Sequence, residues 1–265
     1  MAAGIRGLAA ELFRRRDLLY LITWRDIKIK YKQTIMGFLW AILMPLVIVS
    51  AGLIVRYAFA RLSGKALELD DLVLVAVKAA PWAFFVSGIR FASTSLVANA
   101  SLVTKIYMPR EIFPLAAVLS QLMDFGVAAA VVFALLAIVG VPVHLGLLWV
   151  VPLLALLFLL TAALGIFLSA LALFFRDVKY IVEVMLTFAI FFTPVFYEVS
   201  LFGRWATLLL LNPVAPLLEG LGAAVTGRAM PAPGWLAYSA VVAIGGCIAS
   251  LAFFKKVEPY FAESV

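Results

Sequence analysis

The chain has 265 residues, of which 66% are hydrophobic and only 13% are charged, and its mean hydropathy is +1.15. Soluble domains are about half apolar and about a quarter charged, so this composition predicts an integral membrane protein and excludes water-soluble enzymes. The single cysteine, Cys247, excludes an internal disulfide, and the single histidine, His144, leaves no histidine-based metal cluster. We therefore expect no metal site and no cofactor in this chain.

The formal charge of +7 is unevenly placed, because many cations precede the first long apolar run. They are Arg6, Arg14, Arg15, Arg16, Arg25, Lys28, Lys30 and Lys32. Beside a membrane span, such a cluster marks the cytoplasmic side more often than a nucleic-acid site. The first residues are too polar for a cleavable signal peptide. We expect a cytoplasmic N-terminus and no nucleic-acid partner.

Residues 18–35 are predicted to form an amphipathic helix on the membrane surface. Apolar side chains recur there at helical spacing, at Tyr20, Trp24, Ile27, Tyr31 and Ile35. A basic stripe runs beside them, and tryptophan and tyrosine suit the headgroup region. Ile29 falls on the polar side, so the pattern is imperfect.

Six transmembrane helices are predicted, each near the length of about 20 residues that a bilayer requires. Their approximate ranges are 38–60, 81–103, 113–139, 148–174, 181–199 and 235–254. The apolar piece 72–77 is too short to cross by itself. Residues 201–227 contain Gly203, Pro213 and Pro216, and we expect two short re-entrant helices that enter one leaflet and are buried in protein or line a wet cavity.

An even number of spans places both termini on one side of the membrane. The turns that carry Lys105 with Arg110 and Arg176 with Lys179 then join the basic N-terminus in the cytoplasm, as does the basic C-terminal tail. The fold class is thus all-α integral membrane, in one domain over 1–265. Its parts are a cytoplasmic N-terminal region (1–37), a cytoplasmic loop (104–114) and an outer re-entrant region (201–227).

The loop 104–114 is a polar break with two prolines between two long apolar runs. Met108 precedes a proline and is biased away from helix, whereas Pro109 suits the first turn of a new helix. A phosphate-binding loop is missing, since the only Gly-Lys pair, at Gly64, is followed by Ala66 and lacks the upstream glycine. Energy for any work must come from a partner, and this loop is the candidate receiver.

We take two charges, Arg90 and Asp124, to lie inside membrane runs. Measured from Pro109, they lie 19 residues back and 15 residues on, so their depths differ by only about 6 Å in antiparallel helices. Ionisable groups in a membrane are costly and usually find partners. We predict a structural ion pair between them, in preference to a substrate contact.

The order of several short motifs resembles the permease subunits of ABC type-2 transporters that export polysaccharides such as O-antigen, capsule or teichoic acid precursors. The matching stretches are 24–45 (opening WRDIKIKYKQTIMGFLW), 105–114 (KIYMPREIFP), 119–125 (LSQLMDF), 175–178 (FRDV), 193–197 (TPVFY), 211–213 (LNP) and 257–259 (VEP). Each motif is weak alone, but their ordered combination is specific and covers nearly the whole chain.

This resemblance implies a homodimer of six-span subunits in the bacterial cytoplasmic membrane, bound to two copies of a cytoplasmic ABC ATPase that carries ATP and Mg²⁺. It implies an ATPase-coupling contact formed by the loop residues Tyr107, Met108, Pro109, Arg110 and Glu111, with Arg25, Asp26 and Lys30 nearby. It also implies an outer gate at Asn212 and Pro213.

Aromatic side chains recur every four residues on the predicted fifth span, at Phe188, Phe192 and Phe196, and Tyr197 follows. Packing against helices or lipid is the commoner role of any one of them. Together they are candidates for an aromatic surface along which a sugar chain slides.

The function predicted from the sequence is the permease subunit of an ATP-driven exporter of a lipid-linked polysaccharide. A type-2 permease for a small lipid or a drug is the first alternative. A membrane enzyme acting on lipid-linked sugars is disfavoured by the shortage of paired acid–base groups, and a passive channel by the loop.

Overall fold

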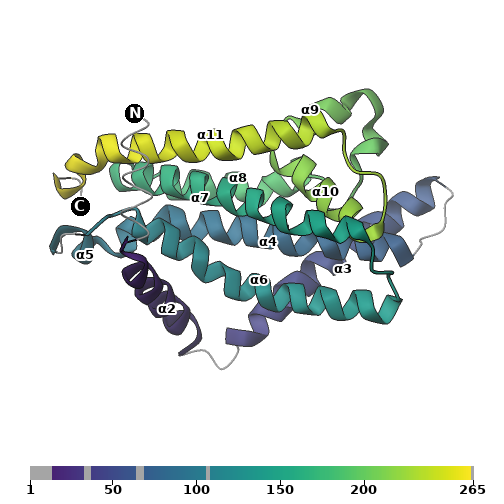
Figure 1. Ribbon diagram of the computed structural model, residues 1–265, viewed down its shortest axis with the longest axis horizontal. Helices are drawn as coiled ribbons and strands as arrows, with labels where there is room; N and C mark the ends of the chain where they lie inside the picture. Colours follow the sequence, from purple (N-terminus) through teal and green to yellow (C-terminus); the bar gives the residue numbers. More distant parts are fainter. Residues whose placement is uncertain (1–13, 33–36, 64–68, 106–107, 264–265) are drawn as a thin grey trace.

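The computed structural model describes residues 14–32, 37–63, 69–105 and 108–263, and every regular element in these residues is a helix. The predicted all-helical class is therefore confirmed (Figure 1). The elements are α2 (Arg16–Lys32), α3 (Gly37–Ser63), α4 (Leu69–Ala98), α5 (Ala100–Lys105), α6 (Ile112–Val139), η1 (Leu145–Trp149), α7 (Val150–Phe174), α8 (Val178–Ala189), η2 (Ile190–Phe192), η3 (Val199–Trp205), α9 (Ala206–Leu210), α10 (Val214–Thr226), α11 (Pro233–Val257) and η4 (Glu258–Glu263).

Among the described residues, four helical stretches are long and apolar enough to cross a membrane. They lie in α4, α6, α7 with η1, and α11 with η4. Each has 26 to 30 residues, against the roughly 20 that a bilayer requires. The chain is thus a multi-pass membrane protein by the length and composition of its helices.

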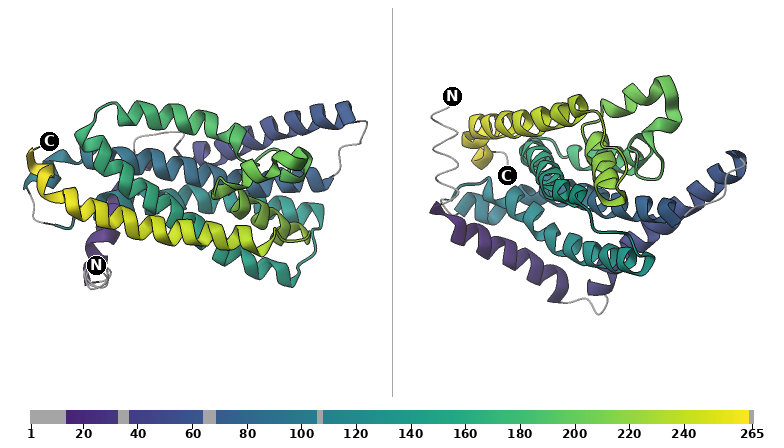
Figure 2. Two further views of the ribbon diagram at one scale, coloured as in Figure 1. Left: turned by 90° about the horizontal axis from the view of Figure 1, so that it is seen from above. Right: turned by 45° about the vertical axis from the view of Figure 1, so that its right-hand side comes forward.

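The four long helices run side by side along the longest axis of the molecule (Figure 1). α4 lies at the centre of the bundle and is largely buried, whereas α6 is buried mainly over its first ten residues and half-buried or exposed over most of the rest. One end of the bundle, called the α5 end below, carries α5, the start of α6 and the C-terminus. α3 is tilted against the bundle and extends beyond it at the opposite end (Figure 2).

The second span, predicted at 81–103, is displaced toward the C-terminus relative to the helix in the structure. α4 starts at Leu69, runs through Pro81 and ends at Ala98, so the apolar piece 72–77 belongs to it. Proline inside a transmembrane helix is tolerated because neighbouring helices satisfy the freed backbone groups. The helix ends before Asn99, whose side-chain Nδ2 donates a hydrogen bond to the backbone carbonyl of Ser95 at 2.8 Å.

The fifth predicted span, 181–199, is not one helix. α8 begins earlier, at Val178, and regular helix ends after Ala189 with only the short η2 following. Thr193 is extended, with φ −122° and ψ 133°. The residue after it is Pro194, and a residue that precedes proline is driven out of the helical region, which explains the early end.

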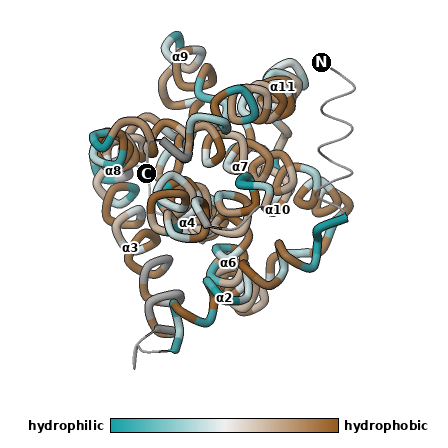
Figure 3. The backbone as a smooth tube through the Cα atoms, turned by 90° about the vertical axis from the view of Figure 1, so that its left-hand side faces the viewer, coloured by the Kyte–Doolittle hydropathy of each residue, from teal (hydrophilic) through white to brown (hydrophobic). Residues whose placement is uncertain are grey.

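A helix is present at the expected position 18–35 as α2, and the predicted last residues lie outside the described ones. Its place on a membrane surface stays a prediction. Ile22 is buried, with Leu18 and Leu19 beside it, against a core cluster shared with α6, α7 and α11. Tyr20 and Trp24 of the predicted apolar stripe face outward, stacked on each other. Viewed from the α5 end, α2 lies at the edge of the bundle next to α6 and mixes hydrophilic and hydrophobic residues (Figure 3).

The region 201–227 is broken, as predicted, into the short helices η3, α9 and α10. α10 is buried along most of its length, between α4, α7, η1 and α11. The entry of these short helices into one leaflet stays a prediction.

The turn between α6 and α7 begins at Gly140. Its φ of +78° ends α6 in the left-handed conformation that glycine adopts without strain.

Candidate functional site: polar clusters at the two ends of the bundle

The first cluster joins the loop before α6 to the C-terminal segment. We call it the loop–tail cluster; its members are Arg110, Glu111, Lys255, Glu258 and Phe261. Nζ of Lys255 lies 3.0 Å from Oε1 and 3.1 Å from Oε2 of Glu111, and it donates a 3.0 Å hydrogen bond to Oε2 of Glu258. Nη1 of Arg110 donates to the backbone carbonyl of Glu258 at 2.6 Å, and its guanidinium lies 5.7 Å from the ring centroid of Phe261.

Helix ends favour this arrangement. Glu111 precedes the first turn of α6, where a carboxylate is stabilised by the helix dipole, and Lys255 lies in the last turn of α11, where a cation is. The side chain of Glu111 has no exposed surface. A buried carboxylate requires such a partner, because an unpaired buried charge is costly.

The predicted coupling contact is thus only partly at the surface. Glu111 is fully buried, so it does not itself present the carboxylate that a direct contact with a partner requires. Pro109 is buried and Met108 is half-buried against the core cluster of α2 and α11. Tyr107 lies outside the described residues. The role of the loop as a coupling contact stays a prediction.

A second cluster ties α2 to α6. Asp124 accepts hydrogen bonds from Nζ of Lys30 and from the hydroxyl of Tyr31. Lys30 also donates to Oε1 of the buried Gln121, at 3.0 Å. Burial, followed by the hydrogen bond and the negative charge of Asp124, raises the pKa of Tyr31 far above its ordinary value, so this phenol stays a donor.

The other α2 residues of the predicted coupling contact also face the bundle. Nη2 of Arg25 donates to Oδ1 of Asp26 and to Oδ1 of Asn99, each at 2.8 Å. Because Asn99 is the residue at which the chain leaves α4, this contact attaches α2 to the segment that leads into the loop 104–114.

The predicted ion pair between Arg90 and Asp124 is wrong. Nε of Arg90 donates to both carboxylate oxygens of Glu183 on α8, at 2.8 and 3.0 Å, whereas Asp124 is paired with α2. Equal depth in the membrane does not decide which helices are neighbours. Glu183 lies near the start of the predicted fifth span, and counting it as a membrane charge would have exposed the competing partner.

The predicted aromatic surface does not form one stripe. Phe188 and Phe192 are exposed, with 57% and 68% of their surface accessible, whereas Phe196 is buried in the core. Regular helix ends at Ala189, between Phe188 and Phe192, so residues four apart no longer lie on one helix face. Tyr197 is half-buried and packs its ring against Phe202, with centroids 4.9 Å apart.

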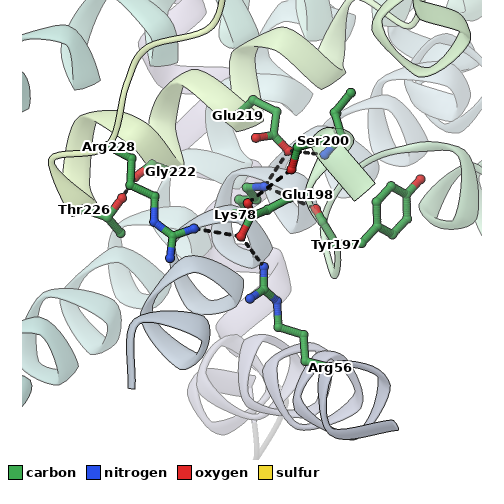
Figure 4. A network of polar contacts seen from close by, with 10 residues as sticks. Arg56, Lys78, Tyr197, Glu198, Ser200, Glu219, Gly222, Thr226 and Arg228 are labelled. Atoms are coloured by element: carbon green, nitrogen blue, oxygen red, sulfur yellow. Dashed lines mark hydrogen bonds and ion pairs between the residues drawn. The ribbon is translucent and has the colours of Figure 1, made fainter. Parts of the chain in front are cut away.

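A third cluster lies toward the end of the bundle opposite α5 (Figure 4). We call it the α10 network; its members are Arg56, Lys78, Glu198, Glu219 and Arg228. Lys78 is 1% exposed, and its ammonium donates to Oε1 of Glu219 on α10 at 2.7 Å. Glu198 accepts from Arg56 at 3.0 Å and from Arg228 at 2.7 Å.

The close packing of α10 on α4 at this point depends on a glycine. A Cβ atom at Gly222 would lie 2.7 Å from Cδ1 of Leu74 and 3.1 Å from Cε of Lys78. Sequence reasoning missed Lys78, because the predicted second span begins at Pro81 and Lys78 precedes it. The unbroken apolar run from Leu72 onward was the signal for a lysine inside the helix.

The predicted gate residues lie where α9 turns into α10. Nδ2 of Asn212 donates to Oγ1 of Thr193 at 2.9 Å, and its Oδ1 accepts from the backbone N–H of Val214 at 3.1 Å. The carbonyl of Pro213 accepts from Oγ of Ser239 on α11, at 2.9 Å. The turn is held from two sides, by the segment after α8 and by α11.

Comparison with known proteins identifies the kind of molecule that these clusters serve. The family model of the ABC-2 type transporter matches residues 17–225, which is most of the chain. The chain belongs to the ABC-2 type transporter family. It is therefore a transport protein rather than an enzyme, and the resemblance stated from its motifs is confirmed at this level.

Relatives match over almost the full length. Two O-antigen export system permease proteins RfbA of Klebsiella pneumoniae are 28% and 27% identical over 254 residues, covering 93% of this chain and 94% of theirs. The permease protein of the same name from Myxococcus xanthus is 27% identical over 263 residues, covering 97% and 99%.

Proposed function

We propose that the chain is the membrane-spanning subunit of an ATP-driven exporter that moves a lipid-linked, O-antigen-like polysaccharide across the bacterial cytoplasmic membrane. One observation carries the proposal: three O-antigen export permeases align with this chain from end to end, at about the same length. Small-molecule permeases of the same family are the alternative that the experiment below must exclude.

The proposed topology has six spans with both termini in the cytoplasm. α3, and α8 with the segment that follows it, join the four long helices as the remaining two spans. The basic turns near Arg110 and Arg176 then lie at the α5 end together with the basic tail of α11, as the positive-inside rule favours. α2 lies along the cytoplasmic surface, with the exposed Tyr20 and Trp24 at headgroup level.

The proposed assembly is a homodimer of this chain with two copies of a cytoplasmic ABC ATPase, on which ATP and Mg²⁺ bind. An exposed apolar face on α8 and the following η2 offers a surface for lipid or for the second copy, because large apolar patches mark lipid or protein contacts. It is formed by Ile181, Val184, Met185, Phe188, Phe191 and Phe192. Closure of the ATPase dimer would move the loop 104–114 and open a path between the two copies.

Co-purification followed by reconstitution tests the proposal. The tagged chain is expected to bring down a cytoplasmic ATPase, and undecaprenyl-linked polysaccharide added to vesicles is expected to stimulate ATP hydrolysis. Stimulation by a small hydrophobic drug or by a free phospholipid, but not by the glycolipid, would assign the chain to the alternative class. Purification without any ATPase would contradict an ATP-driven mechanism.

A further inference from the structure

α11 contacts both the segment before α6 and the turn 211–213, which the resemblance to ABC type-2 permeases assigns to coupling and to the outer gate. At the α5 end, its last turn carries Lys255, which is bound to the buried Glu111 of the loop. Near its start, Oη of Tyr238 donates to the carbonyl of Leu211 at 2.8 Å, and Oγ of Ser239 donates to the carbonyl of Pro213 at 2.9 Å. Those two carbonyls flank Asn212 in the predicted gate turn.

The span between these contacts is one uninterrupted helix. Tyr238 and Lys255 are 17 residues apart, which is about 26 Å at 1.5 Å per residue. An α-helix resists stretching, because lengthening it requires its backbone hydrogen bonds to break. α11 packs along α7, with Ala243 and Phe254 fully buried, and it runs as one helix through Gly245 and Gly246.

The loop end is firmly attached. Lys255 is held by two carboxylates, Glu111 and Glu258, and Arg110 is bonded to the backbone of the η4 turn that follows. Phe261 of η4 is fully buried and packs edge-on against Phe254 of α11, with centroids 5.1 Å apart. Because Glu111 has no exposed surface, the start of α6 cannot shift without displacing the end of α11 or breaking this ion pair.

From these contacts we propose that α11 is the rod that transmits movement of the loop 104–114 to the gate turn 211–213, with Lys255 as the positioning residue at the loop end. Tyr238 and Ser239 form the attachment at the gate end. The inference rests on the proposed ATPase partner, and it extends beyond the family match, which ends at residue 225. It makes the C-terminal segment part of the coupling apparatus rather than a tail.

The test follows the gate turn directly. Leu211, whose side chain is 52% exposed, is replaced by cysteine in a Cys247→Ser background, which leaves one thiol. The complex with the co-purified ATPase is placed in lipid nanodiscs, and labelling by a membrane-impermeant maleimide is timed with and without ATP. Lys255→Met removes the ion pair with Glu111 at the loop end. Tyr238→Phe combined with Ser239→Ala removes the two hydrogen bonds at the gate end.

Each break is expected to reduce the ATP-dependent change in labelling about fivefold or more, since coupling between sites typically corresponds to about 5- to 150-fold. ATP hydrolysis should continue. The two breaks combined should be no worse than the more severe one, because a rod detached at either end transmits nothing. Lys255→Arg, which keeps a cation, should retain most of the response.

Two matched controls lie on the same helix. Lys256→Met removes the neighbouring exposed cation, and Ser250→Ala removes a hydroxyl that bonds only within α11, to the carbonyl of Cys247. Both should respond to ATP as the parent does. Parent-like responses in Lys255→Met and in the gate-end variant, or additive losses when they are combined, would overturn the rod and assign transmission to other helices such as α4. A parent complex without any ATPase would overturn the proposed function, and the inference with it.

Discussion

Breaking the buried pair of the α10 network is expected to be strongly destabilising. Lys78→Met removes the cation and leaves the carboxylate of Glu219 facing an apolar side chain. At the observed 2.7 Å, the Coulomb attraction is about 6 kcal/mol at an effective dielectric constant of about 20. Desolvation offsets much of this attraction in the intact pair, but the penalty remains when one partner is removed.

The expected loss is about 3 kcal/mol, at the lower end of the roughly 3–5 kcal/mol for broken buried pairs. The reason is that Glu219 is 20% exposed and also accepts a hydrogen bond from the backbone N–H of Val199, at 3.3 Å, so it is not left wholly unsatisfied. Lys78→Met with Glu219→Gln should recover at least half of the loss, because the amide oxygen still accepts from Val199 and no charge is left buried.

Denaturant unfolding of the purified protein in detergent measures the free energy, with the near-ultraviolet signal of the tryptophans as readout. Arg228→Met is the control: Arg228 is 38% exposed and shares Glu198 with Arg56, so its loss should change stability by less than about 1 kcal/mol. Equal losses for Lys78→Met and Arg228→Met, or a double variant as unstable as the sum of its singles, would refute the reasoning.

Three further predictions concern the other clusters. Exchange of Arg90 and Glu183 (Arg90→Glu with Glu183→Arg) should restore the folded yield that either single change lowers, measured by size-exclusion chromatography, whereas exchange of Arg90 and Asp124 should not. Asp124→Asn should release α2 and increase its cleavage by trypsin about tenfold, since hydrogen bonds to a charged group contribute about 1.5–3 kcal/mol; unchanged cleavage would count against the anchoring role. Phe196→Ala should cost about 3–5 kcal/mol of unfolding free energy and Phe188→Ala less than about 1 kcal/mol; the reverse order would contradict the burial that distinguishes them.

The membrane class, the helical fold and most element positions follow from the sequence, because a bilayer leaves the backbone few choices. Apolar runs must form helices to satisfy their backbone groups, so α3, α6, α7 and α11 begin and end within a few residues of the prediction. The errors arise at prolines. Pro81 was read as a helix start although it lies inside α4, and Pro194 was passed over although it ends the helix of the fifth span.

The choice of partners was decided only by the tertiary structure. Arg90 and Asp124 could be recognised as costly charges from their positions in the chain, but a charge takes whichever neighbour the packing provides. Asp124 is bound by α2 and Arg90 by α8, and neither pairing leaves a periodic trace in the sequence. Glu111, read as an outward contact, is buried against α11.

The sequence by itself thus determined what kind of protein this is and where its helices lie, since hydropathy and backbone satisfaction act locally along the chain. Only the folded structure determined that the loop 104–114 is attached to the C-terminal helix, and that the same helix reaches the turn at Asn212. Side-chain shape across the whole bundle decides which helices pack together, and a contact such as that of Lys255 with Glu111, 144 positions apart, follows from this packing.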